Sequence, residues 1–196
     1  MVERARPRPR VAILAGGRGS RLGADKPSVA VAGRPLISYP LQAARAAELA
    51  SVVVAKPGTS LPDLDCEVIR EPAAPVHPLL GILAAIAAGD GPVIALGCDM
   101  PFVTPALLDW LADRDAPAVA SVAGRLEPLL AVYGPNDATF LEPALAERAP
   151  LREAAARLDP ELLGERDLAR FGDPRRLVMS INTEADLAEA QSFLAG

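Results

Sequence analysis

Short apolar stretches alternate along this chain with longer segments in which alanine and leucine recur at helical spacing. The short stretches are rich in β-branched residues and predict strands, whereas the longer segments predict helices. Strands are expected at Val11–Leu14, Val52–Ala55, Glu67–Arg70, Val93–Leu96, Ala118–Ser121, Leu129–Tyr133 and Leu177–Ile181. Helices are expected at Leu36–Leu49, Leu79–Ala88, Pro105–Arg114, Pro135–Arg148, Arg152–Arg157 and Thr183–Leu194. This alternation is typical of a mostly parallel sheet with helices on both faces, a three-layer α/β/α fold.

Two helix starts carry clear capping signals. Thr104 precedes Pro105, which suits an N-cap followed by proline at the first helical position, and the spacing of Thr183 and Asp186 matches a capping box. Trp110 lies in an expected helix and is expected to pack in the core. Residues 159–176 show no clear period, and we expect an irregular excursion there before the last strand.

Length and composition fit one folded domain with an aliphatic core. The chain has 196 residues, of which 51% are hydrophobic and only 4% aromatic. A net charge of −5 argues against nucleic acid or an anionic membrane as the main partner. Two cysteines are too few for a disulfide scaffold, and no stretch is long enough to span a membrane. With no apolar signal region near the N-terminus, the cytoplasm is the expected compartment.

The first residues form a basic arm. Arginines alternate with alanine and proline up to Arg10, without helical or strand periodicity. We expect residues 1–9 to be disordered and residues 10–196 to form the domain. Docking to an acidic partner or an anionic substrate is the alternative role for this arm.

A glycine-rich loop with two cations directly follows the first expected strand. It reads LAGGRGSRLGADK from Leu14 to Lys26. Glycines let the backbone turn its N–H groups toward an anion, and the two cations Arg21 and Lys26 can neutralise a triphosphate. We therefore expect nucleotide binding through Leu14, Ala15, Gly16, Gly17, Gly19, Arg21 and Lys26.

The spacing of this loop excludes two common glycine motifs. A P-loop needs lysine immediately after its last glycine and then serine or threonine, but Ala24 follows Gly23 and Pro27 follows Lys26. The dinucleotide-binding fingerprint needs a third glycine where Leu22 stands. The loop is therefore a nucleotide loop of another kind.

Acidic and amide side chains follow other expected strands. In open parallel sheets, ligands collect at the carboxyl ends of the strands, so the glycine loop, Glu71, Asp99 and Asn182 are expected to share one rim. Asp99 ends a wholly apolar run, where a divalent cation would compensate its charge; a turn cap before Pro101 is the alternative. Asn182 could reach a metal or an acceptor, but it could equally cap a helix.

Motifs along nearly the whole chain resemble those of the molybdenum cofactor guanylyltransferases, which are MobA-like nucleotidyltransferases. The resemblance starts at the glycine loop, with its Asp25-Lys26 ending, and continues through later motifs in the order of that family. These are Arg34-Pro35-Leu36-Ile37, His77-Pro78-Leu79-Leu80-Gly81, Cys98-Asp99-Met100-Pro101, the stretch from Glu127 to Tyr133, and Ile181-Asn182-Thr183-x-x-Asp186-Leu187.

The resemblance implies a single-domain, Rossmann-like nucleotidyltransferase fold and a reaction. GMP would pass from Mg-GTP to the terminal phosphate of molybdopterin, with pyrophosphate as leaving group. Lys26, Arg21 and Asp99 would be catalytic, Asp99 would bind Mg²⁺ together with Asn182, and Glu71 would lie near the base and ribose. Gly17 leaves room for a purine, which favours GTP over CTP. Other cofactor-assembly proteins or molybdoenzyme chaperones are possible partners.

Two alternatives stay open at this point. One is another nucleotidyltransferase of the same fold that uses CTP or a different phosphorylated acceptor. The other is a nucleotide-binding scaffold without turnover, since Lys56, Glu71 and Ser180 depart from residues usual in the family. The presence of Lys26 and Asp99 favours an enzyme.

Overall fold

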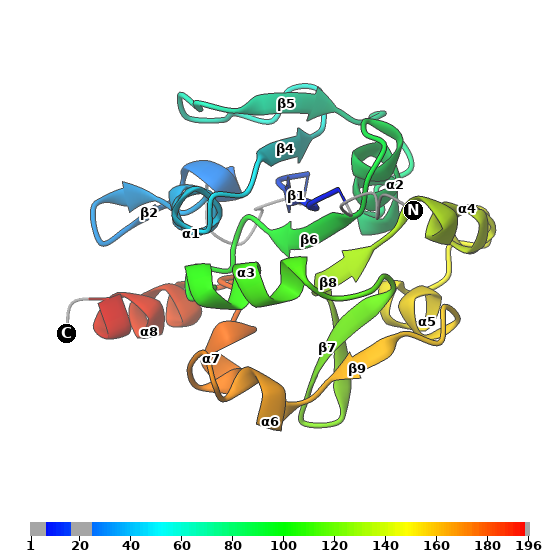
Figure 1. Ribbon diagram of the computed structural model, residues 1–196. Helices are drawn as coiled ribbons and strands as arrows, with labels where there is room; N and C mark the ends of the chain where they lie inside the picture. The colour runs from blue at the N-terminus through cyan, green and yellow to red at the C-terminus, as the bar shows by residue number, and fades with distance from the viewer. Residues whose placement is uncertain (1–6, 17–24, 195–196) are drawn as a thin grey trace.

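A seven-stranded sheet runs through the centre of the protein (Figure 1). The computed structural model describes residues 7–16 and 25–194. In spatial order the strands are β5 (Glu67–Arg70), β4 (Ser51–Ala55), β1 (Arg10–Leu14), β6 (Val93–Gly97), β8 (Arg125–Tyr133), β7 (Ala118–Val122) and β9 (Glu161–Leu163). All but the last of the strands expected from the sequence are confirmed.

The directions of the strands determine which strand ends lie along the same edge of the sheet. Strands β5, β4, β1 and β6 are parallel, so their carboxyl ends lie along one edge of the sheet. Strand β8 runs antiparallel to both β6 and β7, and β7 is parallel to β9. The first half of β8 therefore lies at the same edge as the carboxyl end of β6, where Leu96 pairs with Leu130.

Helices cover both faces of the sheet, which confirms the three-layer α/β/α fold. Alternate residues of β1, β4 and β6 enter two separate apolar clusters, as expected for strands buried on both faces. One cluster includes residues of α1 (Ser38–Ala46) and α3 (Pro105–Ala112). The other includes residues of α2 (Pro78–Ala87), α4 (Ala138–Ala146) and α5 (Leu151–Ala156). Helix α4 follows a 3-10 turn, η2 (Pro135–Asp137).

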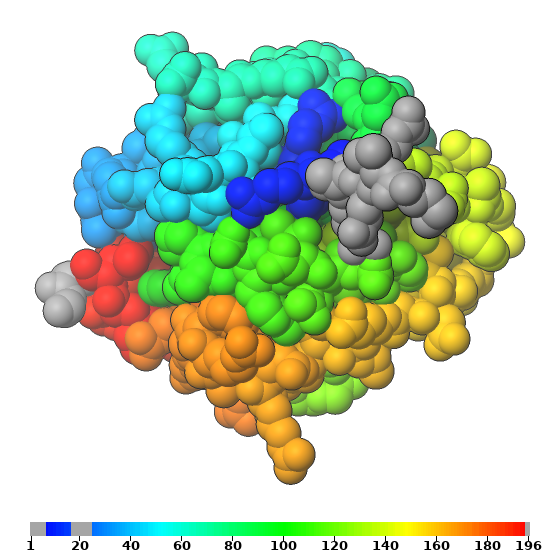
Figure 2. Space-filling view, viewed as in Figure 1, coloured from blue at the N-terminus to red at the C-terminus, as the bar shows by residue number. Residues whose placement is uncertain are grey.

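A third apolar cluster joins a hairpin in the first part of the chain to the C-terminal helix. The hairpin of β2 (Ala30–Val31) and β3 (Arg34–Pro35) packs against α8 (Glu184–Leu194), with Val31, Tyr39 and Ile181 in the shared cluster. Figure 2 shows the red C-terminal helix lying against the blue segment that contains the hairpin. Sequence periodicity did not predict this hairpin.

The prediction of a strand at Leu177–Ile181 is wrong. Residues 159–176 form β9, α6 (Glu165–Leu168) and the start of α7 (Pro174–Leu177), and no strand follows up to residue 194, where the described part of the chain ends. Leu177 and Ile181 are both buried, but they enter different apolar clusters, so their apolar character does not reflect a strand. The backbone N–H of Ile181 instead donates to the carbonyl oxygen of Asp99, 3.0 Å away.

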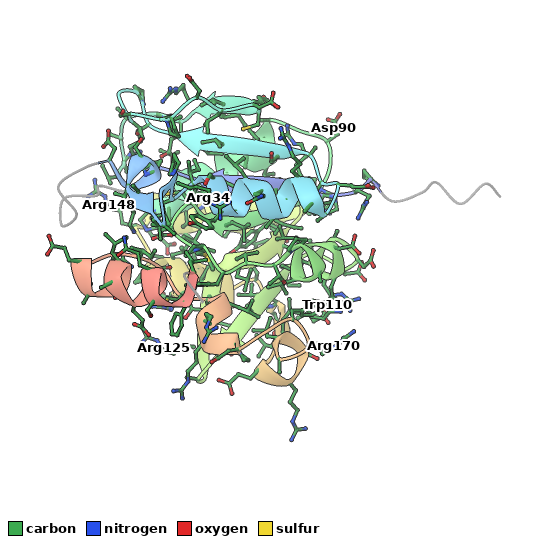
Figure 3. All side chains as sticks on the ribbon, turned by 90° about the vertical axis from the view of Figure 1, so that its left-hand side faces the viewer. Arg34, Asp90, Trp110, Arg125, Arg148 and Arg170 are labelled. Atoms are coloured by element: carbon green, nitrogen blue, oxygen red, sulfur yellow. The ribbon has the colours of Figure 1, made fainter. Side chains whose placement is uncertain are left out.

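Trp110 attaches this excursion to α3. Its ring is half-buried rather than fully enclosed, and it packs at a centroid distance of 5.3 Å against Phe171. The guanidinium groups of Arg114 and Arg170 lie 4.8 and 5.8 Å from its ring centroid. Trp110 and Arg170 are close together in Figure 3. Trp110 thus packs at the margin of the core, where it holds α6 and its following loop.

Adjacent leucines of β9 provide a test of this unexpected strand. Leu163 is 1% exposed in the core, whereas Leu162 is 59% exposed. Leu163→Ala is expected to lower the free energy of unfolding by about 2–4 kcal/mol because it leaves a cavity. Leu162→Ala, the matched control, is expected to change it by about 0.5 kcal/mol or less. Urea denaturation measures both, and equal effects would contradict the register of β9.

The chain before β1 is described only in part. Arg8 Nη2 lies 2.6 Å from Asp109 Oδ1 on α3. Residues 1–6 lie outside the described residues, so the disordered arm at residues 1–9 stays a prediction. Within the described residues, no helix is both long and apolar enough to cross a membrane.

Candidate active site

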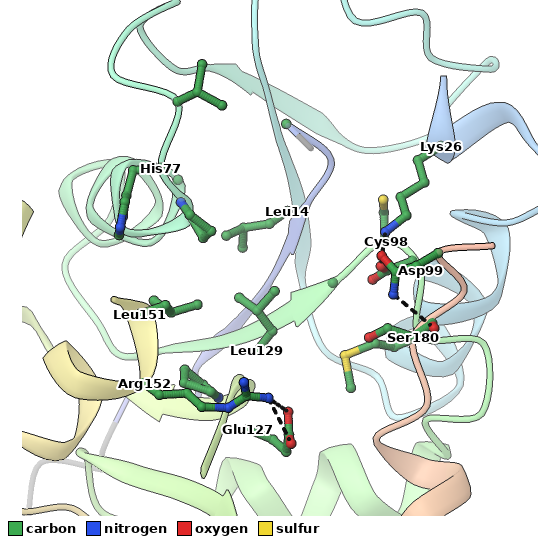
Figure 4. A pocket seen from close by; sticks show the side chains of 18 of the residues that line it. Leu14, Lys26, His77, Cys98, Asp99, Glu127, Leu129, Leu151, Arg152 and Ser180 are labelled. Carbon is green, nitrogen blue, oxygen red and sulfur yellow. Dashed lines mark hydrogen bonds and ion pairs between the residues drawn. The ribbon is translucent and has the colours of Figure 1, made fainter. Parts of the chain in front are cut away.

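A cavity of about 510 Å³ lies at the edge of the sheet where the parallel strands end. Three parts of its wall are visible in Figure 4. Lys26 and Asp99 form one part, Leu14 and His77 lie along a second, and Glu127 and Arg152 lie along the third. These residues are far apart in the sequence, and the sheet edge brings them to a common space.

Lys26 connects two of the residues that the sequence placed at this rim. Its ammonium donates to Asp99 Oδ2 and, at 2.7 Å, to Asn182 Oδ1. The side chains of Lys26 and Asp99 are only 14% and 12% exposed. Asp99 is therefore buried with a compensating charge, and three of the expected site residues are in direct contact.

Local structure positions Lys26 and Asp99 at the rim. Lys26 begins the 3-10 turn η1 (Lys26–Ser28), and the Asp25 carboxylate before it accepts the backbone N–H of Ser60 at 2.8 Å. Asp99 follows β6, directly after Gly97 and Cys98. A Cβ at Gly97 would collide with the Asp99 carboxylate, so a side chain at this position would displace that carboxylate. Cys98 is buried in the core, and this burial raises the pKa of its thiol, which disfavours the nucleophilic thiolate.

Asn182 reaches the rim from a loop and not from the end of a strand. The adjacent N–H of Ile181 is fixed to the Asp99 carbonyl, and the N–H of Asn182 donates to Asp186 Oδ2 at 2.8 Å. Thr183 and Asp186 exchange hydrogen bonds, which confirms the expected capping box of α8. Asn182 thus takes part in the cap through its backbone, and its side chain faces Lys26. Its expected contact with a metal or an acceptor stays a prediction.

The Asp186 carboxylate, which caps α8, is expected to make the stability of the protein depend on pH. The N–H of Asn182 is the main cause that holds the pKa of Asp186 below its ordinary value, with the Thr183 hydroxyl and N–H adding to it. A lowered folded-state pKa stabilises the protein above about pH 3.9, and this contribution is lost as pH falls through the folded value. Wild type is therefore expected to be more stable than Asp186→Asn at pH 7, with a gap that narrows below pH 4. Urea unfolding at both pH values measures this gap; a constant gap would contradict the role of the charge.

Glu71 forms a second buried charged group at the rim. It follows β5 and is 4% exposed, and its Oε1 lies 3.2 Å from Lys56 Nζ. Lys56 also donates to the carbonyl oxygens of Pro72 and Pro75, at 3.0 and 3.3 Å. The second oxygen of Glu71, Oε2, is buried without a hydrogen-bond partner among the described residues. The Glu71 carboxylate therefore retains an unused acceptor beside the cavity.

The start of the glycine loop lies directly against Glu71. A Cβ at Gly16 would collide with Glu71 Oε1, so a side chain at this position would displace the carboxylate. Leu14 and Ala15 are fixed at the end of β1: the Leu14 carbonyl accepts the Cys98 N–H, and the Ala15 N–H donates to Val54. The predicted site residues Gly17, Gly19 and Arg21 lie outside the described residues.

Sequence reasoning left other residues of the cavity wall without a clear role. Lys56 pairs with Glu71, and its position directly after a buried strand was the available signal. His77 Nδ1 accepts the Leu79 N–H at 3.2 Å and caps α2, while its side chain also lines the cavity. Arg152 pairs with Glu127 across a long sequence separation, which no local pattern indicates.

The donor set around Lys26 suits a hard cation. The described residues contain no cluster of three or more His, Cys, Asp or Glu side chains that could hold a metal ion. However, the Lys26 ammonium lies between a carboxylate and an amide oxygen, which are oxygen ligands of the type that Mg²⁺ accepts. Mg²⁺ commonly completes its coordination with phosphate oxygens and water.

Comparison with known proteins agrees with the resemblance found in the sequence. The family model described as "MobA-like NTP transferase domain" matches residues 11–175. A molybdenum cofactor guanylyltransferase from Cereibacter sphaeroides is 34% identical over 193 residues, which cover 93% of this chain and 95% of that relative. A probable molybdenum cofactor guanylyltransferase from Thermococcus kodakarensis is 34% identical over 147 residues, covering 70% and 72% of the two chains.

A solved structure extends this agreement to the fold. The crystal structure of molybdopterin-guanine dinucleotide biosynthesis protein A from Archaeoglobus fulgidus superimposes with a TM-score of 0.79 at 27% identity. The match covers 95% of this chain and 98% of that one. The chain is therefore a nucleotidyltransferase and belongs to the MobA-like NTP transferase family, in the group of the molybdenum cofactor guanylyltransferases.

Proposed function

We propose that this nucleotidyltransferase transfers GMP from magnesium-bound GTP to the terminal phosphate of molybdopterin carrying molybdenum. The products are the guanine dinucleotide form of the cofactor and pyrophosphate. The observation that supports this most directly is the contact of Lys26 with both Asp99 and Asn182 at the rim of the cavity. The relatives named as molybdenum cofactor guanylyltransferases support the identity of the donor and the acceptor.

The reaction needs charge neutralisation more than proton transfer. An oxygen of the acceptor phosphate forms a bond to the α-phosphorus of GTP while the bond from that phosphorus to the pyrophosphate oxygen breaks in line. The attacking phosphate is already ionised, so no side chain has to remove a proton. Lys26 donates to the phosphates and compensates the charge that develops on the leaving pyrophosphate. Arg21 is proposed for the same role on the basis of the sequence.

Asp99 and the amide oxygen of Asn182 are the groups proposed to hold Mg²⁺. When bound, the ion neutralises phosphate charge and helps to orient the triphosphate. Asp99 would supply the formal negative charge and Asn182 a neutral oxygen, and both oxygens accept from Lys26 Nζ. Lys26 is then free to donate to phosphate oxygens.

The nucleoside is proposed to lie between the glycine loop and Glu71. Gly16 allows close approach to this carboxylate, and Glu71 Oε2 has an unused acceptor position. Guanine presents N–H donors on its pyrimidine edge, and the ribose presents hydroxyl donors, so either satisfies this oxygen. The backbone of Leu14 and Ala15, with Gly17 and Gly19, is proposed to complete the nucleotide loop. The cytoplasm remains the proposed compartment, and assembly proteins or molybdoenzyme chaperones are the proposed receivers of the product.

Calorimetry with GTP, CTP, ATP and UTP, each with and without Mg²⁺, tests the nucleotide part of this proposal. Magnesium-dependent preference for GTP is expected in wild type and in Asp109→Ala, and its loss is expected in Asp99→Ala. Asp109 is a suitable control because it is an exposed aspartate whose partner is Arg8. A preference for CTP would indicate a cytidylyltransferase, and the absence of nucleotide binding would overturn the proposal.

A further inference from the structure

The part of the cavity wall beside β8 has no role in the nucleotide proposal. Four apolar residues there surround one charged pair. We call this surface the β8 wall; it consists of Glu127, Pro128, Leu129, Leu151, Arg152 and Val178. In Figure 4 the Glu127–Arg152 pair and the side chains of Leu129 and Leu151 lie along the same side of the cavity.

An irregularity in β8 places Glu127 on this wall. Val119 of β7 pairs with Ala131, but the next residue, Ala120, pairs with Glu127, so residues 128–130 have no partner on β7. Pro128 lies within this bulge and has no N–H for a ladder. Bulges bend a strand and redirect its side chains. The bulge therefore interrupts the pairing of β8 with β7 at the point where β8 lines the cavity.

The charged pair is fixed by Arg152 and leaves Glu127 with acceptor capacity. Arg152 Nε donates to the Leu126 carbonyl at 2.8 Å, and its Nη2 lies 3.3 Å from both carboxylate oxygens of Glu127. These distances exceed the roughly 2.7–2.9 Å of a strong charge-assisted hydrogen bond. A carboxylate offers about four acceptor positions, and no other described residue donates to Glu127. Its side chain is 25% exposed, so a ligand in the cavity can reach it.

We propose that Glu127 determines specificity for the acceptor by binding the donor edge of a pterin ring. This inference rests on the proposed function, which makes a pterin phosphate the acceptor. The 2-amino group and the adjacent ring N3–H of a pterin are neighbouring donors, which two oxygens of one carboxylate can accept together. The apolar side chains of the β8 wall pack against the faces of the ring. Arg152 is a positioning residue that holds the carboxylate toward the cavity.

Glu127 should discriminate between a pterin and an analogue that lacks one of the two hydrogen-bond donors. Lumazine has the pterin skeleton but carries an oxygen in place of the 2-amino group, so it would present one donor and one acceptor to Glu127. A site that accepts two donors binds such an analogue more weakly, because polar atoms are left unpaired. The amide of Glu127→Gln, in contrast, has one donor and one acceptor, and it complements lumazine better than pterin.

The test uses a pterin and a lumazine that carry the same short alkyl phosphate. Their binding is measured with the full chain saturated with Mg²⁺ and a non-hydrolysable GTP analogue, so that the nucleotide site is already filled. Wild type is expected to prefer the pterin phosphate by about tenfold. Glu127→Gln is expected to lose this preference or reverse it, and Glu142→Gln, on the outside of α4, is expected to keep it.

The GTP analogue separates failure of this inference from failure of the proposed function. If wild type does not bind the analogue, the proposed function fails. If all variants bind the analogue equally, two outcomes would show that the proposed role of Glu127 is wrong. One is that wild type does not prefer the pterin phosphate, and the other is that Glu127→Gln keeps the wild-type preference. Arg152→Gln is expected to weaken pterin preference without changing affinity for the analogue. Loss of analogue affinity in Glu127→Gln would assign the residue to the nucleotide instead and would also overturn the inference.

Discussion

Asp99→Asn is expected to lower kcat/KM for guanylyl transfer by about a thousandfold, because asparagine keeps the size of the side chain but removes its charge. The amide oxygen can still accept from Lys26, so the local structure is disturbed little. The neutral side chain holds Mg²⁺ poorly, and charge stabilisation of several kcal/mol in the transition state is lost. Pyrophosphate release measured against GTP and Mg²⁺ concentration gives the size of this effect.

Asp109→Asn is the matched control for this experiment. Asp109 is an aspartate at the surface, with 62% of its side chain exposed, and it lies on α3 away from the residues that line the cavity. This variant is expected to retain wild-type activity. If Asp99→Asn also retained activity within about threefold, the proposed magnesium role of Asp99 would be wrong.

Lys26→Met is expected to make the stability of the protein dependent on Mg²⁺. Removal of the ammonium leaves the Asp99 carboxylate, which is 12% exposed, without its charged partner. Breaking such a buried pair is expected to lower the free energy of unfolding by about 3 kcal/mol in the absence of metal. Millimolar Mg²⁺ is expected to restore much of this loss because it replaces the missing positive charge. Urea denaturation with EDTA and with Mg²⁺ measures the difference.

Lys56→Met is the control that shows whether recovery of stability with Mg²⁺ is specific to Lys26 or follows the loss of any buried lysine. Lys56 and Lys26 are equally buried, each with 14% of the side chain exposed, and each pairs with a buried carboxylate. Both variants are expected to be destabilised, but only Lys26→Met is expected to recover with Mg²⁺. Equal recovery of the two variants, or recovery of neither, would contradict a magnesium site at Asp99.

The central strands could be predicted because burial on both faces leaves continuous apolar runs in β1, β4 and β6. The β2–β3 hairpin could not, since its strands have two residues each and its turn places Ala32 at φ 46°, where asparagine or aspartate would have been a clearer signal. The false strand at Leu177–Ile181 has another cause. Leu177 and Ile181 are apolar because they pack into separate clusters, and periodicity does not show which neighbour buries a side chain.

In the candidate site too, residues close to the strands could be predicted, whereas contacts that form only in the folded protein could not. Lys26 and Asp99 could be placed at one rim because the glycine loop that ends in Lys26 follows β1 and Asp99 follows β6. Asn182 was placed there from a strand that does not exist, and it reaches Lys26 because the neighbouring Ile181 binds the Asp99 backbone. The partners of Glu71 and Glu127 could not be predicted, since Lys56 and Arg152 meet them only after the chain has folded.

The tie between Ile181 and the Asp99 carbonyl also sets an order of events during synthesis. The sheet residues that hold Lys26 and Asp99 leave the ribosome well before Asn182 does. A nascent chain can therefore form the central strands and the Lys26–Asp99 pair while its third rim residue is still inside the exit tunnel. Assembly of this rim is therefore completed only after the segment before α8 has emerged and docked.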